Sequence, residues 1–145
     1  MRITDQIKRI VKEYDLKDHV IFLGQLNSED MAHQLCKANV FVMPSCVETH
    51  SSSLREAMYI GCPVVSAMVG SVAEFVHHEE NGFLYRYDEI ETMAYYIDQL
   101  FSNQLMSKKL SDAGRITIRR KYPQEQIGEI LFNAYSQIIV DKKEN

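Results

Sequence analysis

The chain has 145 residues, of which 46% are hydrophobic, so it is long enough to bury one substantial core. It carries 16 Lys and Arg residues against 20 Asp and Glu residues, which gives a net charge of -4. This balance leaves no excess of basic surface, which argues against nucleic acid as a partner and against contact with an anionic membrane.

No stretch approaches the roughly 20 consecutive apolar residues that are needed to cross a bilayer. The N-terminal MRITDQIKRI also lacks the uninterrupted apolar core of a signal peptide. The three cysteines, Cys36, Cys46 and Cys62, are widely spaced and form no C-x-x-C pair, as expected for reduced thiols. We therefore predict one cytoplasmic domain that spans residues 1–145.

Short apolar runs alternate with segments of helical period along the chain. The predicted strands are residues 20–23 (VIFL), 40–43 (VFVM), 63–66 (PVVS) and 83–85 (FLY). The predicted helices lie at about residues 3–14, 28–37, 53–60, 71–77 and 89–101, and a long helical tail runs to about residue 140. Strands without a polar face are typical of a parallel sheet buried on both sides. The pattern predicts a doubly wound, Rossmann-like α/β domain with helices on both faces of the sheet.

Turn and cap residues mark several boundaries of these elements. Ser28 is expected to cap the helix that it precedes, and Asn81-Gly82 is expected to form a turn. Gly61 is expected to end one helix just before the next strand. The run HHEE at residues 77–80 is interpreted as a solvated helix end and not as a metal site, because adjacent helical residues point in different directions.

In a domain of this class, ligands bind beyond the carboxyl ends of the strands. We therefore expect the loops at residues 24–27, 44–52 and 67–71 to line a shared crevice. The second of these loops leads into a helix through three serines, Ser51, Ser52 and Ser53. The free backbone N–H groups and the positive dipole end of that helix suit an anion such as a phosphate, and the hydroxyls can add donors.

Two glutamates, Glu48 and Glu56, flank these serines. A carboxylate can accept hydrogen bonds from adjacent hydroxyls, so the segment offers both the acceptors and the donors that a nucleotide sugar requires. A simpler explanation stays open for each residue. Ser53 and Glu56 have the spacing of a helix capping box, and Glu48 can be a solvated loop residue.

The segment PSCVETHSSSLREAMYIGCPVV resembles the motif PS-x-x-E-x7-E-A-M-x-x-G-x-P-V-V of the retaining glycosyltransferases with the GT-B fold, in family 4. The similarity continues upstream through HVIFLGQL and LCKANVFVMPS, and downstream through MVGSVAEFVHHEENGFLYRYDE. It covers nearly the whole chain and implies the C-terminal, nucleotide-sugar-binding half of such an enzyme.

The resemblance also implies roles for individual residues. Glu48 would be the catalytic-site carboxylate that holds hydroxyls of the donor sugar, and Glu56 would accept from the ribose hydroxyls. Backbone N–H groups of residues 52–54 would contact the phosphate or sugar, and residues 24–26 would lie beside the base. The full set of expected donor-binding residues is Gly24, Gln25, Leu26, Ser45, Glu48, Ser51, Ser52, Ser53, Leu54, Glu56, Gly70 and Glu74. The donor would be a UDP- or GDP-sugar, and neither a cofactor nor a metal is expected.

Two features distinguish the chain from the usual family pattern. Many members have Gly-Phe-Gly-Leu where this chain has HSSSL at residues 50–54, which is nearer to a variant found in some cell-surface polysaccharide enzymes. The match also begins partway into the C-terminal half, so the basic residues that clamp the diphosphate and the N-terminal acceptor domain have no counterpart here. We therefore expect little or no sugar transfer by this chain alone.

The partial match has a consequence for the sheet. In the usual strand order 3-2-1-4-5-6, the strand at residues 20–23 would be separated from the one at 40–43, leaving two apolar edges exposed. We expect either a rearranged sheet or pairing with another copy of the chain. The alternative function is a non-catalytic remnant of the same fold that binds a nucleotide or a partner.

Overall fold

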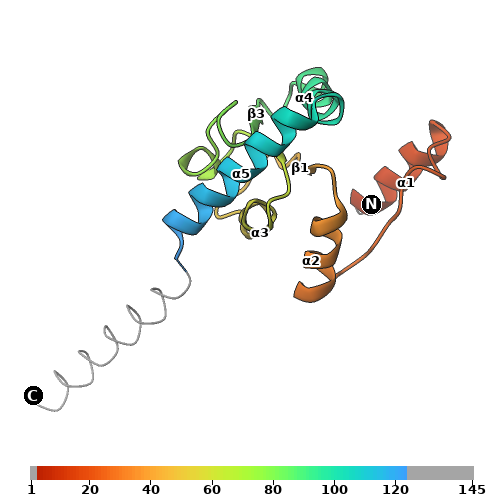
Figure 1. The fold of residues 1–145 in the computed structure, drawn as a ribbon. Helices are drawn as coiled ribbons and strands as arrows, with labels where there is room; N and C mark the ends of the chain where they lie inside the picture. The colour runs from red at the N-terminus through yellow and green to blue at the C-terminus, as the bar shows by residue number, and fades with distance from the viewer. Residues whose placement is uncertain (1–2, 124–145) are drawn as a thin grey trace, which may run out of the picture. The chain divides into compact units, whose positions relative to one another are not determined.

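The computed structural model describes residues 3–123, and the end of the predicted helical tail lies outside these residues. The chain divides into two compact units, Met1–Met31 and Ala32–Asn145, which are treated separately below. Figure 1 follows the elements in chain order from α1 to α5.

The first unit contains the amphipathic helix α1 (Ile3–Glu13), as predicted. The helix ends where Asp15 adopts a φ of 52° and the Leu16 N–H donates to the Val11 carbonyl at 2.8 Å. The predicted strand at residues 20–23 is wrong, because this segment has no regular structure and the Ile21 side chain is 83% exposed. No described strand pairs with it, so its backbone groups lack the ladder that defines a strand.

Helix α2 (Ser28–Lys37) begins in the first unit at the predicted position. Its cap is Asn27 and not Ser28. The Asp30 N–H donates to Asn27 Oδ1, and Asn27 Nδ2 donates to Asp30 Oδ2, each at 2.8 Å. The first bond gives the Asp30 N–H an acceptor that it would otherwise lack, and the second joins the two side chains.

The second unit is built on a parallel sheet of β1 (Phe41–Met43), β2 (Val64–Ala67) and β3 (Phe83–Tyr85) in that order. Val42 pairs with Val65 in register, and Ser66 pairs with Leu84. Three of the four predicted strands are therefore confirmed. The three strands keep the parallel order of a doubly wound domain, so the described sheet has not rearranged.

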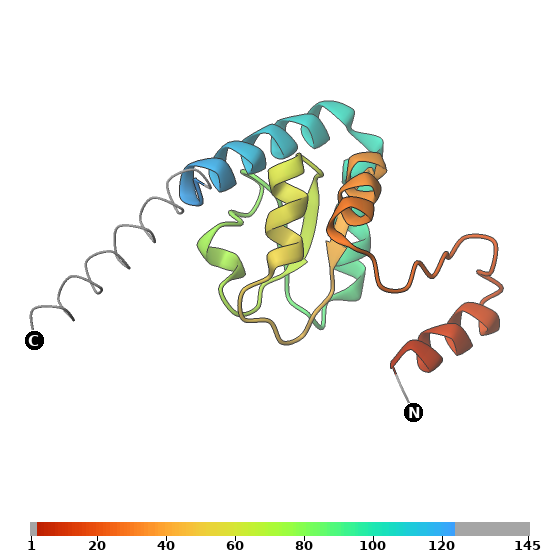
Figure 2. The same cartoon turned by 90° about the horizontal axis from the view of Figure 1, so that it is seen from below.

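Helices cover both faces of this sheet. All residues of β2 are buried, and successive side chains of a strand point to opposite faces, so both faces must be shielded from water. Helix α3 (Ser52–Ile60) lies over one face and α4 (Ile90–Ser102) over the other, with α5 (Gln104–Lys121) beside both helices (Figure 2). The core on the α4 side contains Val65, Ala67, Phe83, Tyr85, Leu100 and Leu110. The predicted α/β class, with helices on both faces of a parallel sheet, is confirmed.

Two further boundaries show how single side chains set local structure. Gly61 ends α3 at a φ of +97°, and its N–H donates to the Ala57 carbonyl at 3.0 Å, as its predicted role requires. The predicted helix at residues 71–77 is only a short 3-10 turn, η1 (Val72–Glu74). The helix does not continue, because the Asn81 side chain accepts a hydrogen bond from the His77 N–H at 2.7 Å and donates one to the Phe75 carbonyl at 3.0 Å.

Candidate functional site

The loops that follow β1 and β2 lie in contact, as predicted. Gly70 has a φ of +53°, and a Cβ built on it would lie 1.8 Å from the carbonyl oxygen of Glu48. The Ser71 hydroxyl donates to the Thr49 carbonyl at 2.5 Å. Only glycine fits at position 70 without moving the backbone, so the second loop fixes the position of Glu48 in the first.

The start of α3 leaves three backbone donors free. The first helical hydrogen bond joins the Arg55 N–H to the Ser51 carbonyl at 3.2 Å. The N–H groups of Ser52, Ser53 and Leu54 donate to no other residue that the structure describes. Ser51 is the N-cap, but its side chain makes no capping bond. The helix start is therefore free, and such a start suits an anion; that it binds one stays a prediction.

The hydroxyls of the serine run are not equivalent. Ser51 is only 2% exposed, and its hydroxyl donates to the Met43 sulfur at 2.8 Å. This hydroxyl therefore holds the loop to the strand and is not available to a ligand. Ser52 is exposed and Ser53 is half-buried, whereas Leu54 is fully buried and offers only its backbone N–H.

Glu56 is the fifth residue of α3 and lies just beyond its first turn. The capping-box explanation is excluded, because the helix begins with Ser51 as its cap and not with Ser53. The Glu56 side chain is exposed and pairs with no other described residue. Helical side chains lean toward the N-terminus, so this carboxylate remains free on the side of the vacant N–H groups.

Glu48 is half-buried in the loop ahead of α3. One of its carboxylate oxygens, Oε1, accepts the N–H of Thr49 at 2.9 Å. This bond orients the side chain and leaves the second oxygen without a described partner. The residue is therefore more ordered than a freely solvated loop glutamate.

Other predicted residues fall into three groups. Ser45 is half-buried in the same loop. Glu74 is exposed, and its carboxylate lies 3.9 Å from Lys121 Nζ, which also donates to the Glu74 carbonyl. Gly24, Gln25 and Leu26 belong to the first unit, so their role beside the base stays a prediction.

Arg55, on α3, makes contacts with Tyr122 and with the loop before the helix that the sequence did not predict. Its guanidinium carbon lies 5.0 Å from the centre of the Tyr122 ring, and its Nη2 donates to the His50 carbonyl at 3.5 Å. The Nε atom is buried and has no acceptor among the described residues. The partner Tyr122 lies far along the chain, so no local pattern predicts the contact.

Among the described residues, no three His, Cys, Asp or Glu side chains lie close enough together to hold a metal ion. Burial raises the pKa of Cys62 to about 11, whereas Cys46 is exposed in the loop.

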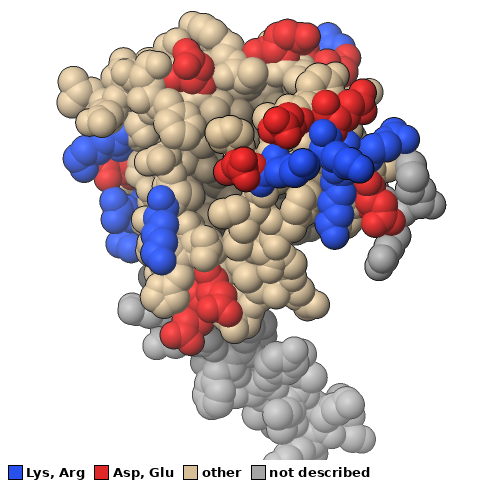
Figure 3. All heavy atoms as spheres, turned by 90° about the vertical axis from the view of Figure 1, so that its right-hand side faces the viewer, with Lys and Arg blue, Asp and Glu red and all other residues tan. Residues whose placement is uncertain are grey.

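None of the described helices is both long and apolar enough to cross a membrane. The face drawn in Figure 3 carries basic and acidic side chains together.

Several solved structures share the fold of this chain. Sucrose-phosphate synthase from Thermosynechococcus elongatus is 30% identical with a TM-score of 0.86, and the match covers 94% of this chain and 34% of that one. The C-terminal domain of a group 1 glycosyl transferase, LpcC from Francisella tularensis, has the same fold at 24% identity and a TM-score of 0.75, with coverage of 82% and 62%. TarM from S. aureus, in complex with fondaparinux, alpha-GlcNAc-glycerol and UDP, is 26% identical with a TM-score of 0.78, with coverage of 91% and 27%.

The chain spans about a third of the length of the curated relatives that it matches: the matches cover 34% of one relative and 35% of another. The family described as Glycosyl transferases group 1 matches residues 4–117, which include parts of both units and every residue of the predicted donor site. The chain therefore belongs to the group 1 glycosyltransferases.

Proposed function

We propose that this chain is the donor-binding part of a retaining glycosyltransferase that uses a UDP- or GDP-sugar. The observation that carries the proposal is the set of free N–H groups at residues 52–54, with one unpaired carboxylate, Glu56, and one half-paired carboxylate, Glu48, close to it in the chain. The donors suit phosphate oxygens, and the carboxylates suit hydroxyls. A nucleotide sugar carries both kinds of group.

In this proposal each carboxylate holds a different part of the donor. Glu48, which Gly70 fixes in place, accepts hydroxyls of the transferred sugar, and Glu56 accepts the ribose hydroxyls. The phosphates lie at the start of α3. The UDP in the complex of the related TarM supports a uridine nucleotide as the first candidate.

The proposed reaction replaces the nucleoside diphosphate by an acceptor hydroxyl at the anomeric carbon, with retained configuration. Its main requirement is stabilisation of the negative charge that develops on the departing phosphate. The helix start supplies part of this stabilisation. We further propose that the acceptor site and a basic clamp for the diphosphate belong to the part of the relatives' length that this chain does not match, and that the enzyme acts in the cytoplasm in polysaccharide or glycoconjugate synthesis.

Isothermal titration calorimetry with UDP-glucose, UDP-N-acetylglucosamine and GDP-mannose tests the donor site. A hydrogen bond to a charged group is worth about 1.5–3 kcal/mol, so Glu56→Ala should weaken binding by about 10- to 100-fold. Glu80→Ala is the matched control, because Glu80 is equally exposed but lies in the turn before β3. The donor-site proposal fails if all three titrations of the wild-type chain give no heat, or if Glu56→Ala binds like Glu80→Ala.

A second candidate is a non-catalytic remnant that binds a partner, for example another copy of the chain. It is favoured by the exposed apolar segment at residues 20–23, where Ile21 is 83% and Leu23 is 51% exposed. Such a segment can add to the edge of a sheet. Light scattering over a wide range of protein concentrations tests it, and a constant monomer mass together with nucleotide-sugar binding would reject the candidate.

A further inference from the structure

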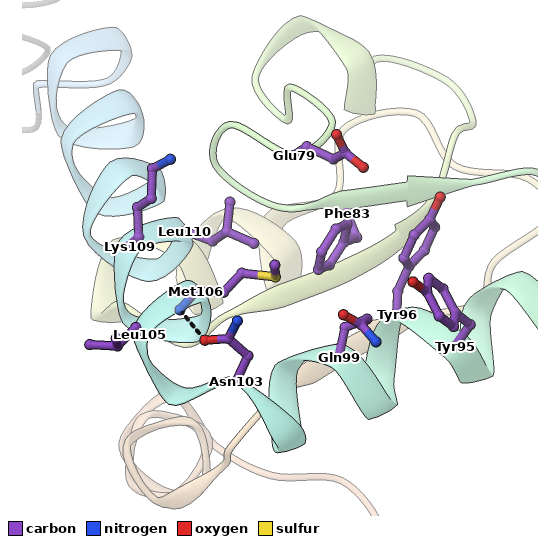
Figure 4. A pocket seen from close by; sticks show the side chains of 10 residues that line it. All are labelled: Glu79, Phe83, Tyr95, Tyr96, Gln99, Asn103, Leu105, Met106, Lys109 and Leu110. Atoms are coloured by element: carbon purple, nitrogen blue, oxygen red, sulfur yellow. Dashed lines mark hydrogen bonds between the residues drawn. The ribbon is translucent and has the colours of Figure 1, made fainter.

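A cavity of about 500 Å³ lies between β3, α4 and the start of α5 (Figure 4). Its wall includes Phe83, the first residue of β3. The cavity therefore opens at the amino edge of the parallel sheet, whereas the donor loops follow the carboxyl ends of β1 and β2. The proposed donor site makes no use of it.

The back and one side of the cavity are aromatic. The rings of Phe83 and Tyr96 are stacked, with centroids 4.5 Å apart and an angle of 2° between their planes. Tyr95 lies beside them at 5.7 Å from Tyr96, and it is 57% exposed. Phe83 is buried and Tyr96 is half-buried, so the stacked pair forms a fixed wall, and Tyr95 leaves part of its ring open to a ligand.

The remaining lining combines apolar side chains with polar groups that have few partners, and the apolar ones are Leu105, Met106 and Leu110. The Gln99 carboxamide and the Lys109 ammonium pair with no other side chain in the described part of the molecule. Asn103 caps α5 by accepting the Met106 N–H at 3.0 Å, which leaves its NH₂ group free. Glu79 lies across the cavity from Lys109. Its Oε1 atom is 3.7 Å from His78 Nε2, which is a long contact.

This combination restricts the chemistry of an occupant. One carboxylate opposes one ammonium, so a phosphate or another anion would lie near Glu79 as well as Lys109. A purely apolar chain would cover the half-buried Gln99 and the exposed Asn103 without offering their amides a hydrogen bond, which is unfavourable. A neutral ring with several hydroxyls fits the balanced charges, the carboxamides and the open aromatic face together.

We propose that this cavity binds one pyranose unit of a neutral oligosaccharide. The apolar face of the sugar packs on Tyr95, and its hydroxyls exchange hydrogen bonds with Gln99, Asn103, Glu79 and Lys109. The volume lies within the range of about 300–1,000 Å³ that is usual for ligand sites. The inference does not depend on the donor-binding role of Glu56.

Saturation-transfer NMR of the full chain with maltohexaose, cellohexaose and chitohexaose as separate probes tests the proposal. At least one of the three should bind. Tyr95→Ala and Gln99→Ala should each weaken that binding by about tenfold. Tyr95→Phe keeps the ring and should bind like the wild type, which separates stacking on the ring from hydrogen bonding by the hydroxyl.

Asp98→Asn is the matched surface control, because Asp98 is exposed on α4 and does not line the cavity. Glu56→Ala should leave oligosaccharide binding unchanged, whatever it does to nucleotide-sugar binding. The proposal is overturned if none of the three probes binds. It is also overturned if Tyr95→Ala and Gln99→Ala bind as strongly as Asp98→Asn, or if Glu56→Ala abolishes the signal.

Discussion

Gly70 lies so close to Glu48 that a Cβ on the glycine would come within 1.8 Å of the glutamate carbonyl oxygen. One contact therefore joins the loop after β2 to the loop that carries the candidate donor carboxylate. Ser71 strengthens the contact through its hydrogen bond to Thr49. The position of Glu48 depends on a glycine outside its own loop.

Gly70→Ala should destabilise the protein and weaken nucleotide-sugar binding, because the loops must move apart and the new side chain must adopt a positive φ. Strain of this kind costs about 1–3 kcal/mol. Urea denaturation gives the loss of stability, and calorimetry gives the loss of affinity. Gly24→Ala is the control for stability, because Gly24 also has a positive φ of +70° but has no other atom within 4 Å of its Cβ position. Equal losses of stability for the two substitutions would contradict the proposed contact.

The sequence predicted the second unit well, because its signals are local. Each of β1, β2 and β3 is a short apolar run with turn residues at its ends, and Gly61 ends α3 through its own backbone geometry. Residues 20–23 carry the same apolar signal but form no strand. Strand formation needs a partner, and composition does not reveal whether one is present.

The candidate site was predictable only in part. The free N–H groups of α3 follow from the serine run and the helix start, and the adjacent carboxylates follow from the spacing of Glu48 and Glu56. The use of the Ser51 hydroxyl depends on its burial against Met43, and the contact of Arg55 depends on Tyr122. Both are tertiary contacts, and the periodicity of hydrophobic residues in the sequence does not predict such contacts.

Asn81 is expected to be the most sensitive polar residue of the second unit. It is 4% exposed, accepts the His77 N–H, and donates to the Phe75 carbonyl and to the Thr117 hydroxyl at 3.1 Å. Asn81→Ala removes the side-chain partners of the His77 N–H and of the buried Phe75 carbonyl, which should cost about 1–3 kcal/mol. Thr117→Val removes only one of these bonds, so in urea denaturation it should cost clearly less. A smaller loss for Asn81→Ala than for Thr117→Val would contradict this assignment.

Cys62 should resist alkylation while the chain is folded. Burial raises its pKa from 9.0 to about 11, so about one molecule in a thousand carries the thiolate at pH 8. Cys36 and Cys46 are exposed and should react with iodoacetamide first. Mass spectrometry of the peptides after timed labelling measures the order, and rapid labelling of Cys62 in the folded chain would contradict it.

The same shift predicts a loss of stability in alkali. The pKa of Cys62 is higher in the folded chain than in the unfolded one, so its contribution to stability is complete below about pH 9 and is lost as the pH rises toward 11. Urea denaturation between pH 8 and pH 11 should show a steeper decline for the wild type than for Cys62→Ala. Parallel declines would show that the thiol does not carry this dependence.

His78 should protect the open edge of β3. Its Nδ1 accepts the Leu84 N–H at 3.0 Å, and its ring packs edge-on against Phe83 and Tyr96. His78→Ala exposes a strand N–H group that can pair with another chain, so the variant should self-associate more strongly than the wild type. His78→Gln retains a side-chain acceptor and is the control. Sedimentation velocity at several concentrations measures the effect, and identical behaviour of His78→Ala and the wild type would mean that the imidazole does not guard this edge.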